Sequence, residues 1–227
     1  MKLSNRLDNI ARFIPNCKCI ADIGTDHGLI PIYAVLNGIC DKAIASDIKK
    51  GPLQAAKKNI EYYGLLDKIE LRLGSGLEVL KLGEANVIVI AGMGGYTISN
   101  LLEAEEKIAK EAEFLILQPT QHPEALRRYL VNFGFKILDE ELVKDDNKYY
   151  HIIKTSKGEE PPYKNEAIYY LGLRLIEKKH YLLREYLTFN LKKLYNVSEK
   201  LDPNTQMDRY KEVHELIKGF EDVMKCL

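Results

Sequence analysis

The sequence has no excess of charge of either sign, because its 33 lysine and arginine residues equal its 33 aspartate and glutamate residues. A chain without net charge exerts no overall attraction for nucleic acid, so any basic surface for such a partner has to be local. The sequence also lacks a run of about 18 apolar residues, which excludes a membrane-spanning helix and argues against a membrane partner. Its amphipathic first 14 residues have no apolar centre, so they do not read as a signal peptide.

Cysteine is scarce, with four residues at positions 17, 19, 40 and 226. Cys17 and Cys19 form a C-x-C pair, but no second pair completes a zinc site, so no metal is expected. Reduced thiols in the cytoplasm are the ordinary interpretation of such cysteine usage. What the chain does contain, 46% hydrophobic and 29% charged residues, is the composition of a globular protein.

Segments with strand and helix character alternate along the first part of the chain. The segments with strand character are residues 19–24, 42–48, 68–74, 85–92 and 113–119. Such alternation predicts a parallel sheet with helices on both faces. Residues 135–157 then add two strands split by a turn signal, Asp145-Asp146-Asn147, which predicts an antiparallel hairpin. We therefore expect the Rossmann-like α/β fold of class I methyltransferases, with a mostly parallel seven-stranded sheet that ends in an antiparallel hairpin.

A cluster of one glycine, two acids and two prolines at residues 158–163 indicates a domain boundary. We expect residues 1–160 to form the α/β domain that binds a cofactor. Residues 161–227 contain less glycine and fewer β-branched residues, and they are expected to form a helical appendage.

The appendage has a regular apolar pattern. From Tyr169 to Leu201 the pattern alternates spacings of four and three, as in the seam of a coiled coil. A second amphipathic stretch follows the break at residues 203–204. The two stretches predict two helices folded back as an antiparallel hairpin. Because such a seam can close within one chain or between two, we expect a monomer or a weak dimer.

The stretch D-I-G-T-D-H-G, residues 22–28, joins the first strand to the next helix, where open α/β sheets bind nucleotides. Its glycines let the backbone approach a ligand closely. Asp26 stands where the dinucleotide fingerprint has its middle glycine, and a carboxylate there disfavours pyrophosphate, which needs bare amides. The acids suit a cationic or zwitterionic ligand such as S-adenosylmethionine. The alternative is a tight turn whose acids only cap the helix.

Two further strand ends carry features of a binding site. Asp47 ends the second strand, where an acid can accept hydrogen bonds from both ribose hydroxyls of S-adenosylmethionine or NAD. The fourth strand ends in A-G-M-G-G-Y, residues 91–96, where three glycines allow close approach by a ligand, unless they form only a flexible loop. Methyltransferases of exocyclic amines usually carry Asn/Asp-Pro-Pro-aromatic here. Its absence favours a ring nitrogen, whose lone pair attacks without first losing a proton.

Five blocks of the sequence carry a family resemblance. They are DIGTDHGLIP, SDIKKGPLQAAKKN, LRLGSGLEVL, IAGMGGYTISNLL and LILQPTQHPEALRRYL. In content and order they resemble the bacterial tRNA (adenine-22-N1)-methyltransferase family, TrmK, as does the early S-x-R-L of residues 4–7. The resemblance covers residue 4 to about residue 155, and the helical appendage is similar in position and kind. It implies methylation of adenine N1 in the D-arm region of tRNA, with S-adenosylmethionine as cofactor.

The resemblance also implies roles for individual residues. It places Asp47 at the ribose, residues 75–77 at the adenine and residues 92–93 at the methyl-donor side. The full set for the cofactor is Asp22, Gly24, Thr25, Gly28, Asp47, Ile48, Ser75, Gly76, Leu77, Gly92 and Met93. The catalytic polar groups expected nearest the target base are Asp26, His27 and Gln118. Many class I methyltransferases have an acid where Ser75 stands, so the adenine contacts of this chain are expected to differ.

A locally basic segment is expected to bind tRNA. Over residues 174–193 six basic residues stand against two acids, with Tyr181 and Tyr186 among them. A basic helix with interleaved aromatics suits phosphate contacts, although a solvated helix face is the ordinary alternative. The substrate-binding candidates, including some beside the sheet, are Arg6, Gly94, Gly95, Tyr96, Arg127, Arg174, Lys178, Lys179 and Arg184.

Three other functions remain open from the residues alone. An NAD-dependent oxidoreductase is disfavoured by Asp26 and by the missing glycine of the fingerprint. A non-catalytic module that senses a nucleoside and recruits a partner through its helices is favoured only by the unusual G-M-G-G block. A methyltransferase for a small molecule or a protein would keep the fold, but it leaves the basic helix without a role.

Overall fold

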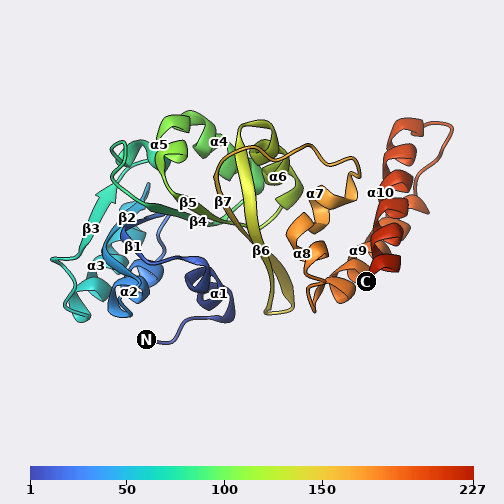
Figure 1. Cartoon of the computed structure of the whole chain (residues 1–227). Coiled ribbons are helices and arrows are strands. Elements are labelled where there is room, and N and C mark those ends of the chain that lie inside the picture. The colour runs from blue at the N-terminus through green and yellow to red at the C-terminus, as the bar shows by residue number, and fades with distance from the viewer. The chain divides into compact units, whose positions relative to one another are not determined.

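A seven-stranded sheet forms the centre of the first part of the chain in the computed structural model, which describes all 227 residues (Figure 1). Its strands are β1 (Cys17–Ile23), β2 (Cys40–Asp47), β3 (Ile69–Leu73), β4 (Val87–Met93), β5 (Phe114–Pro119), β6 (Phe135–Asp145) and β7 (Lys148–Lys157). The order across the sheet is β3-β2-β1-β4-β5-β7-β6. The first five strands pair in parallel, whereas β7 is antiparallel to both β5 and β6. The prediction of a Rossmann-like methyltransferase sheet with a terminal hairpin is confirmed.

Helices cover both faces of the sheet, as the alternating pattern predicts. One apolar cluster joins the sheet to α1 (Asn5–Phe13), α2 (Leu29–Leu36) and α3 (Lys50–Tyr62). The other cluster joins the opposite face to α4 (Gly95–Ala104), α5 (Glu106–Glu111), α6 (Pro123–Asn132) and the 3-10 helix η1 (Gly76–Val79). Burial of apolar side chains on both faces is the main favourable contribution to this layered arrangement.

The turn between β6 and β7 shows how local sequence determines the hairpin. Asp146 and Asn147 have φ angles of 47° and 58°. Aspartate and asparagine tolerate this left-handed region better than other residues with side chains, and two such residues in succession match the twist of a two-residue hairpin. The hairpin then brings β7 back beside β5.

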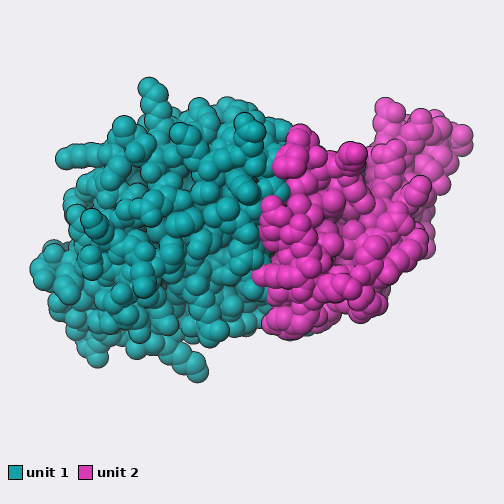
Figure 2. All heavy atoms as spheres, viewed as in Figure 1, with its two compact units in different colours: residues 1–160 teal, residues 161–227 magenta.

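The chain divides into two units, residues 1–160 and residues 161–227, which are shown in different colours in Figure 2. The second unit contains α7 (Ala167–Leu171), α8 (Leu173–Glu177), α9 (Leu183–Ser198) and α10 (Met207–Cys226). Helices α9 and α10 form an antiparallel pair, because residues early in α9 meet residues late in α10. For example, Arg184 contacts Met224, whereas Ser198 contacts His214. No helix in the structure combines the length and the apolar character that crossing a membrane requires.

The expectation of one continuous helix through the seam from Tyr169 to Leu201 is wrong. The helix is interrupted at Gly172, whose φ angle is 91°, and again over residues 178–182, where Lys179 has a φ angle of 47°. Both values lie outside the helical region. The spacing of the apolar residues continues across these breaks, so the pattern alone does not reveal them.

Candidate active site

The carboxyl ends of the parallel strands meet at one edge of the sheet, and this edge carries the candidate site. Asp22 lies at the end of β1, Asp47 ends β2 and Met93 ends β4. Strand β1 lies between β2 and β4, so the chain crosses to the other side of the sheet after β3. Open α/β sheets bind ligands at such a switch point.

The loop of residues 22–28 is fixed by hydrogen bonds to neighbouring elements. The N–H groups of Gly24 and Thr25 donate to the Ser46 carbonyl at 2.9 and 2.7 Å. The Asn59 amide of α3 donates to the His27 carbonyl at 2.8 Å. These bonds hold the loop against β2 and α3, and they leave its carboxylates at the edge of the sheet.

Gly28 has a structural role as well as a position in the predicted site. Its φ angle is 67°, and a Cβ atom there would lie 3.2 Å from the Cβ of Ala56. A glycine therefore allows α2 to begin close against α3. Thr25, also predicted at the cofactor, belongs to the same loop and is fully buried.

A cavity of about 250 Å³ opens beside this loop, and it brings together part of the predicted site. Its lining residues are Arg6, Leu7, Asp22, Gly24, Asp26, Leu29, Ile30, Ala91 and Gly92. Five of these residues were predicted from the sequence, and they come from α1, from the first strand and the loop after it, and from the end of β4: Arg6, Asp22, Gly24, Asp26 and Gly92. Leu7, Leu29, Ile30 and Ala91 were missed, because their apolar spacing reads only as the inner face of a helix or strand.

The cavity wall carries negative charge that is only partly exposed to solvent. Asp22 is 6% exposed, and the pKa of its carboxyl is raised to about 6, chiefly by this burial. The nearby carboxylates of Asp26 and Asp47 contribute to this raised pKa, because like charges disfavour ionisation. A cationic group in the cavity would offset both effects. These carboxylates therefore fit the positively charged ammonium and sulfonium groups of S-adenosylmethionine.

The buried Gln118 and the partly buried Arg6 are hydrogen-bonded to each other beside the cavity. The Arg6 Nη1 donates to the Gln118 Oε1 at 2.6 Å, and the Gly92 N–H donates to the same oxygen at 3.2 Å. The Gln118 Nε2 donates to the Pro119 carbonyl at 2.9 Å. Gln118 is fully buried and does not line the cavity, so the expectation that it lies at the target base is not met. It instead positions Arg6 and the Gly92 backbone.

Asp26 and His27 lie where a substrate can reach them. The His27 Nε2 is 3.2 Å from the Asp26 Oδ1, and both side chains are more than half exposed. Asp26 also lines the cavity, so it borders both the cofactor space and solvent. The two residues are thus the predicted catalytic groups that remain accessible.

The residues expected around the ribose and adenine lie on the same edge, outside the lining of the cavity. The Asp47 Oδ1 accepts a hydrogen bond from the Lys49 N–H at 2.7 Å, and the Ile48 side chain is exposed. The Ser75 N–H donates to the Glu78 Oε1 at 2.7 Å, which fixes the start of η1, and Gly76 follows with a φ angle of 52°. Leu77 is 1% exposed and its side chain belongs to the apolar core, so its place beside the adenine stays a prediction.

Gly24, which follows the first strand, and Gly94 and Gly95, which follow the fourth, have different neighbours in the structure. A Cβ atom on Gly24 would lie 2.2 Å from the Met93 Cε, so that glycine makes room for Met93. A Cβ atom on Gly95 would lie 2.0 Å from the His122 carbonyl oxygen. Gly95 is therefore buried against the backbone of the loop before α6, and the prediction that it binds substrate is wrong. Gly94 precedes α4 as its N-cap.

Tyr96 remains a candidate for contact with a base. Its side chain is 61% exposed, and its ring lies 5.1 Å from the imidazole ring of His122. Aromatic rings on such a surface can stack on an unpaired base.

Arg127 does not belong to a substrate surface, contrary to the prediction. Its side chain is fully buried on α6, where its Nε donates to the Glu140 Oε1 at 2.6 Å. Its Nη2 lies 3.0 Å from the His151 Nδ1. Buried charges of this kind are paired within the protein, and they are not available to a phosphate.

The basic residues predicted at the second unit are located on α8, on α9 and in the segment between them. Lys178, Lys179 and Arg184 are exposed. The Arg174 Nη1 is 2.9 Å from the Glu177 Oε2, so its charge is offset by that carboxylate.

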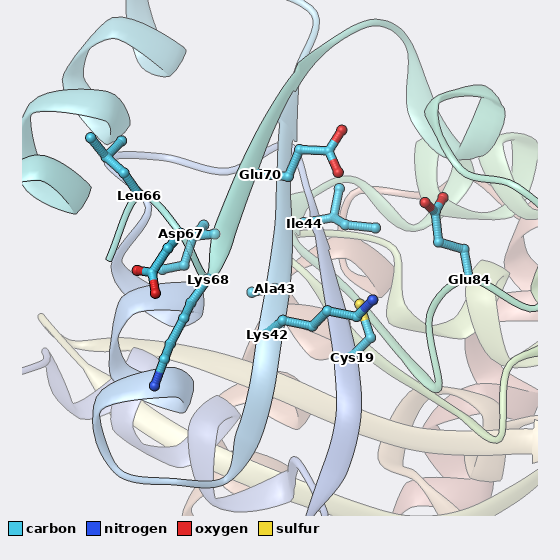
Figure 3. A pocket seen from close by; sticks show the side chains of 10 residues that line it. Cys19, Lys42, Ala43, Ile44, Leu66, Asp67, Lys68, Glu70 and Glu84 are labelled. Atoms are coloured by element: carbon cyan, nitrogen blue, oxygen red, sulfur yellow. The ribbon is translucent and has the colours of Figure 1, made fainter. Parts of the chain in front are cut away.

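A second cavity, of about 220 Å³, lies near the opposite ends of β1, β2 and β3 (Figure 3). Lys42, Lys68, Glu70 and Glu84 contribute charges to its wall. Arg72 bridges the two glutamates, at 2.8 Å from Glu70 and 2.7 Å from Glu84. None of the predicted site residues lines this cavity, and the switch point of the sheet lies at the other edge.

The sheet order, the terminal hairpin and the acidic loop after β1 together define a class I methyltransferase. A family model described as a methyltransferase domain matches residues 3–153. The tRNA (adenine(22)-N(1))-methyltransferase of Bacillus subtilis (strain 168) is 43% identical over 159 residues, which cover 70% of this chain and 67% of that protein.

Solved structures give the same relationship. The crystal structure of the B. subtilis M1A22 tRNA methyltransferase TrmK matches with a TM-score of 0.89 and 34% identity, and covers 98% of this chain and 99% of that one. Streptococcus pneumoniae Sp1610 in complex with S-adenosyl-L-methionine matches with a TM-score of 0.89 and 29% identity, and covers 98% and 100% of the two chains. The chain belongs to the tRNA (adenine(22)-N(1))-methyltransferase family. The resemblance carried by the five sequence blocks is thereby confirmed.

Proposed function

We propose that this protein transfers the methyl group of S-adenosylmethionine to N1 of adenine 22 in tRNA. The observation that carries this proposal is the cavity beside the β1 loop, which is lined by the buried Asp22 and by Asp26, with the Asp47 carboxylate near enough to affect Asp22. A cation is the ligand that this arrangement favours. The B. subtilis relative supplies the reaction and its target position, and the S. pneumoniae structure holds the same cofactor.

The cofactor would be held by residues from three strand ends. Asp22 and Asp26 would face its cationic groups, Gly24 and Gly92 would give the backbone access to it, and Asp47 would accept hydrogen bonds from its ribose. When bound, the cofactor supplies an activated methyl group. The contribution of the chain is then to exclude water and to align the acceptor nitrogen with that methyl.

The acceptor base has to leave its stack before it can react. Adenine N1 lies on the pairing edge, so a duplex hides it and the enzyme has to extrude the base. Tyr96 would stack on the extruded ring. Asp26 would stabilise the positive charge that adenine gains on N1 methylation, since its carboxylate borders both the cavity and solvent.

We further propose a division of labour between the two units. Residues 1–160 would bind the cofactor, and residues 161–227 would contact the tRNA backbone through Lys178, Lys179 and Arg184. These cations are exposed, and phosphate contacts of this type supply affinity without reading sequence. The reaction would take place in the cytoplasm, where tRNA is the available substrate.

A methyl-transfer assay tests the proposed reaction. Labelled S-adenosylmethionine is incubated with an unmodified tRNA transcript and with the same transcript in which guanine replaces adenine 22. We expect 1-methyladenosine in the first transcript only, located by mass spectrometry of nuclease fragments. Cofactor binding without transfer to any tRNA would contradict the substrate, and absence of cofactor binding would contradict the class of reaction.

Two variants then separate catalysis from binding. Asp26→Asn should lower the turnover rate on tRNA by about 10-fold or more, because it removes a charge that opposes the cationic product. Lys178→Gln with Lys179→Gln should weaken tRNA binding and reduce its salt dependence, while cofactor affinity stays unchanged. Full turnover by Asp26→Asn at normal cofactor affinity would exclude Asp26 from the reaction.

A further inference from the structure

Two cysteines face each other at the amino ends of β1 and β2. Cys17 begins β1, Cys40 begins β2, and the two residues are direct partners in the parallel register. Adjacent strands lie about 4.8 Å apart. Disulfides span Cα separations of about 4.4–6.8 Å, so this pairing places the two residues within bridging distance. Both thiols are free in the structure.

The two thiols also interact with one another. A hydrogen bond between them lowers the pKa of the Cys40 thiol and raises the pKa of the Cys17 thiol. The directions of the two pKa shifts favour Cys40, which is 3% exposed, as the thiolate of the pair. Cys17 is only half-buried, so it is the sulfur that a small molecule reaches first. Thiol–disulfide exchange proceeds through a thiolate, and Cys40 can accept the proton of the accessible Cys17 thiol as Cys17 reacts.

We propose that Cys17 and Cys40 are a site of reversible oxidation, at which exchange with a small disulfide such as oxidised glutathione forms an intrachain disulfide. In the first step Cys17 passes its proton to the Cys40 thiolate, and the Cys17 thiolate so formed bonds to one glutathione sulfur. The other glutathione leaves and takes that proton from Cys40, so it departs as a thiol and Cys40 is again a thiolate. In the second step the Cys40 thiolate attacks the Cys17 sulfur and expels the second glutathione, which takes up the remaining proton. Two protein thiols are oxidised and one glutathione disulfide is reduced to two thiols.

The position of the pair distinguishes this site from the candidate active site. The cysteines lie at the starts of β1 and β2, whereas Asp22 and Asp47 lie at the ends of the same strands. A bond between them would close a loop of residues 17–40 that contains the whole segment 22–28. Oxidation would therefore restrain the cofactor loop from the far edge of the sheet without occupying the cavity.

Peptide mapping of the oxidised full chain tests the proposal. The protein is incubated with oxidised glutathione, its remaining thiols are blocked, and it is unfolded and cleaved after lysine and arginine. Cys17 then lies on residues 13–18, whereas Cys19 and Cys40 share residues 19–42. A second cleavage before aspartate separates Cys19, on residues 19–21, from Cys40, on residues 26–40.

We expect residues 13–18 joined to residues 26–40, with a mass about 2 Da below the sum of the reduced peptides, and separation of the two by dithiothreitol. A link from residues 13–18 to residues 19–21 would instead assign the bond to Cys17 and Cys19. That result would overturn the proposal, as would glutathione adducts with no intrachain link.

Matched variants provide an independent test. In a Cys226→Ser background, which removes the exposed thiol, Cys19→Ala should retain the intrachain link and Cys40→Ala should lose it. Circular dichroism establishes that each variant is folded before oxidation. Persistence of the link in Cys40→Ala would overturn the proposal. The wild-type peptide map decides the question even if a variant does not fold.

Discussion

The affinity for S-adenosylmethionine should fall as the pH falls through the pKa of Asp22. Burial raises that pKa to about 6, and Asp22 lines the cavity in which the cationic cofactor would bind. With a pKa of about 6, about one carboxyl in eleven is ionised at pH 5 and about ten in eleven at pH 7. If only the ionised form binds well, the dissociation constant should be about 10-fold larger at pH 5 than at pH 7.

The stability of the ligand-free protein should change in the opposite direction. The pKa of Asp22 is higher in the folded protein than the value of about 3.9 in an unfolded chain, so folding favours the protonated form. This contribution is fully present below about pH 4 and is lost as the pH rises through about 6. Its size is about 3 kcal/mol of unfolding free energy. Deprotonation of one buried carboxyl thus weakens the fold while it strengthens cofactor binding.

Isothermal titration calorimetry between pH 5 and pH 7 measures the affinity without a fluorescent reporter, which suits a chain that has no tryptophan. Asp22→Asn should bind more weakly and show little dependence on pH. Imidazole side chains also exchange protons in this range, so His27→Gln serves as the matched control and should keep the wild-type dependence. Equal affinity at both pH values in the wild type, or an unchanged dependence in Asp22→Asn, would refute the reasoning.

Two substitutions should change the free energy of unfolding, measured by urea denaturation. Gly95→Ala should lower it by about 1–3 kcal/mol, because the added Cβ atom meets the His122 carbonyl, whereas Gly51→Ala has open space and should raise it by up to about 1 kcal/mol. Arg127→Met should lower it by about 3–5 kcal/mol, because the Glu140 carboxylate loses its buried partner, and adding Glu140→Gln should restore much of the loss. Equal changes in the free energy of unfolding for Gly95→Ala and Gly51→Ala would contradict the close packing at Gly95. A failure of Glu140→Gln to restore stability to Arg127→Met would contradict the buried ion pair.

The α/β sheet could be predicted from sequence because its determinants are local. Strands β1, β2, β4 and β5 each contain a short apolar run and are each followed by a helix, and short connections leave few topologies. The breaks in the helical appendage illustrate the limit. Gly172 gave a visible signal, but Lys179 adopts a positive φ angle that lysine rarely takes, and only the surrounding fold accounts for it.

The sequence predicted only those residues of the candidate site whose positions follow from the ends of the parallel strands. Carboxylates at the ends of β1 and β2 had to share one edge, and the structure places them there. Burial depends on partners distant in sequence, so Arg127 was misassigned, because Glu140 and His151 lie on other elements. A signal was present, since Arg127 shares a helix face with the buried Leu130 and Val131, and a cation on such a face needs an internal partner.

The glycines of the candidate site show why a glycine motif is not by itself evidence of a ligand. At Gly28 and Gly95 the missing side chain makes room for Ala56 and for a backbone carbonyl, and at Gly24 it makes room for Met93. Gly92 is different, because the nearest protein atom to its absent Cβ is 3.9 Å away and the residue lines the cavity. Its N–H is already held by Gln118, so the open space in front of it is fixed in position. Gly92 has a φ angle of 80°, which by itself favours glycine, but of these four it is the one whose absent side chain leaves open space and not room for another part of the protein.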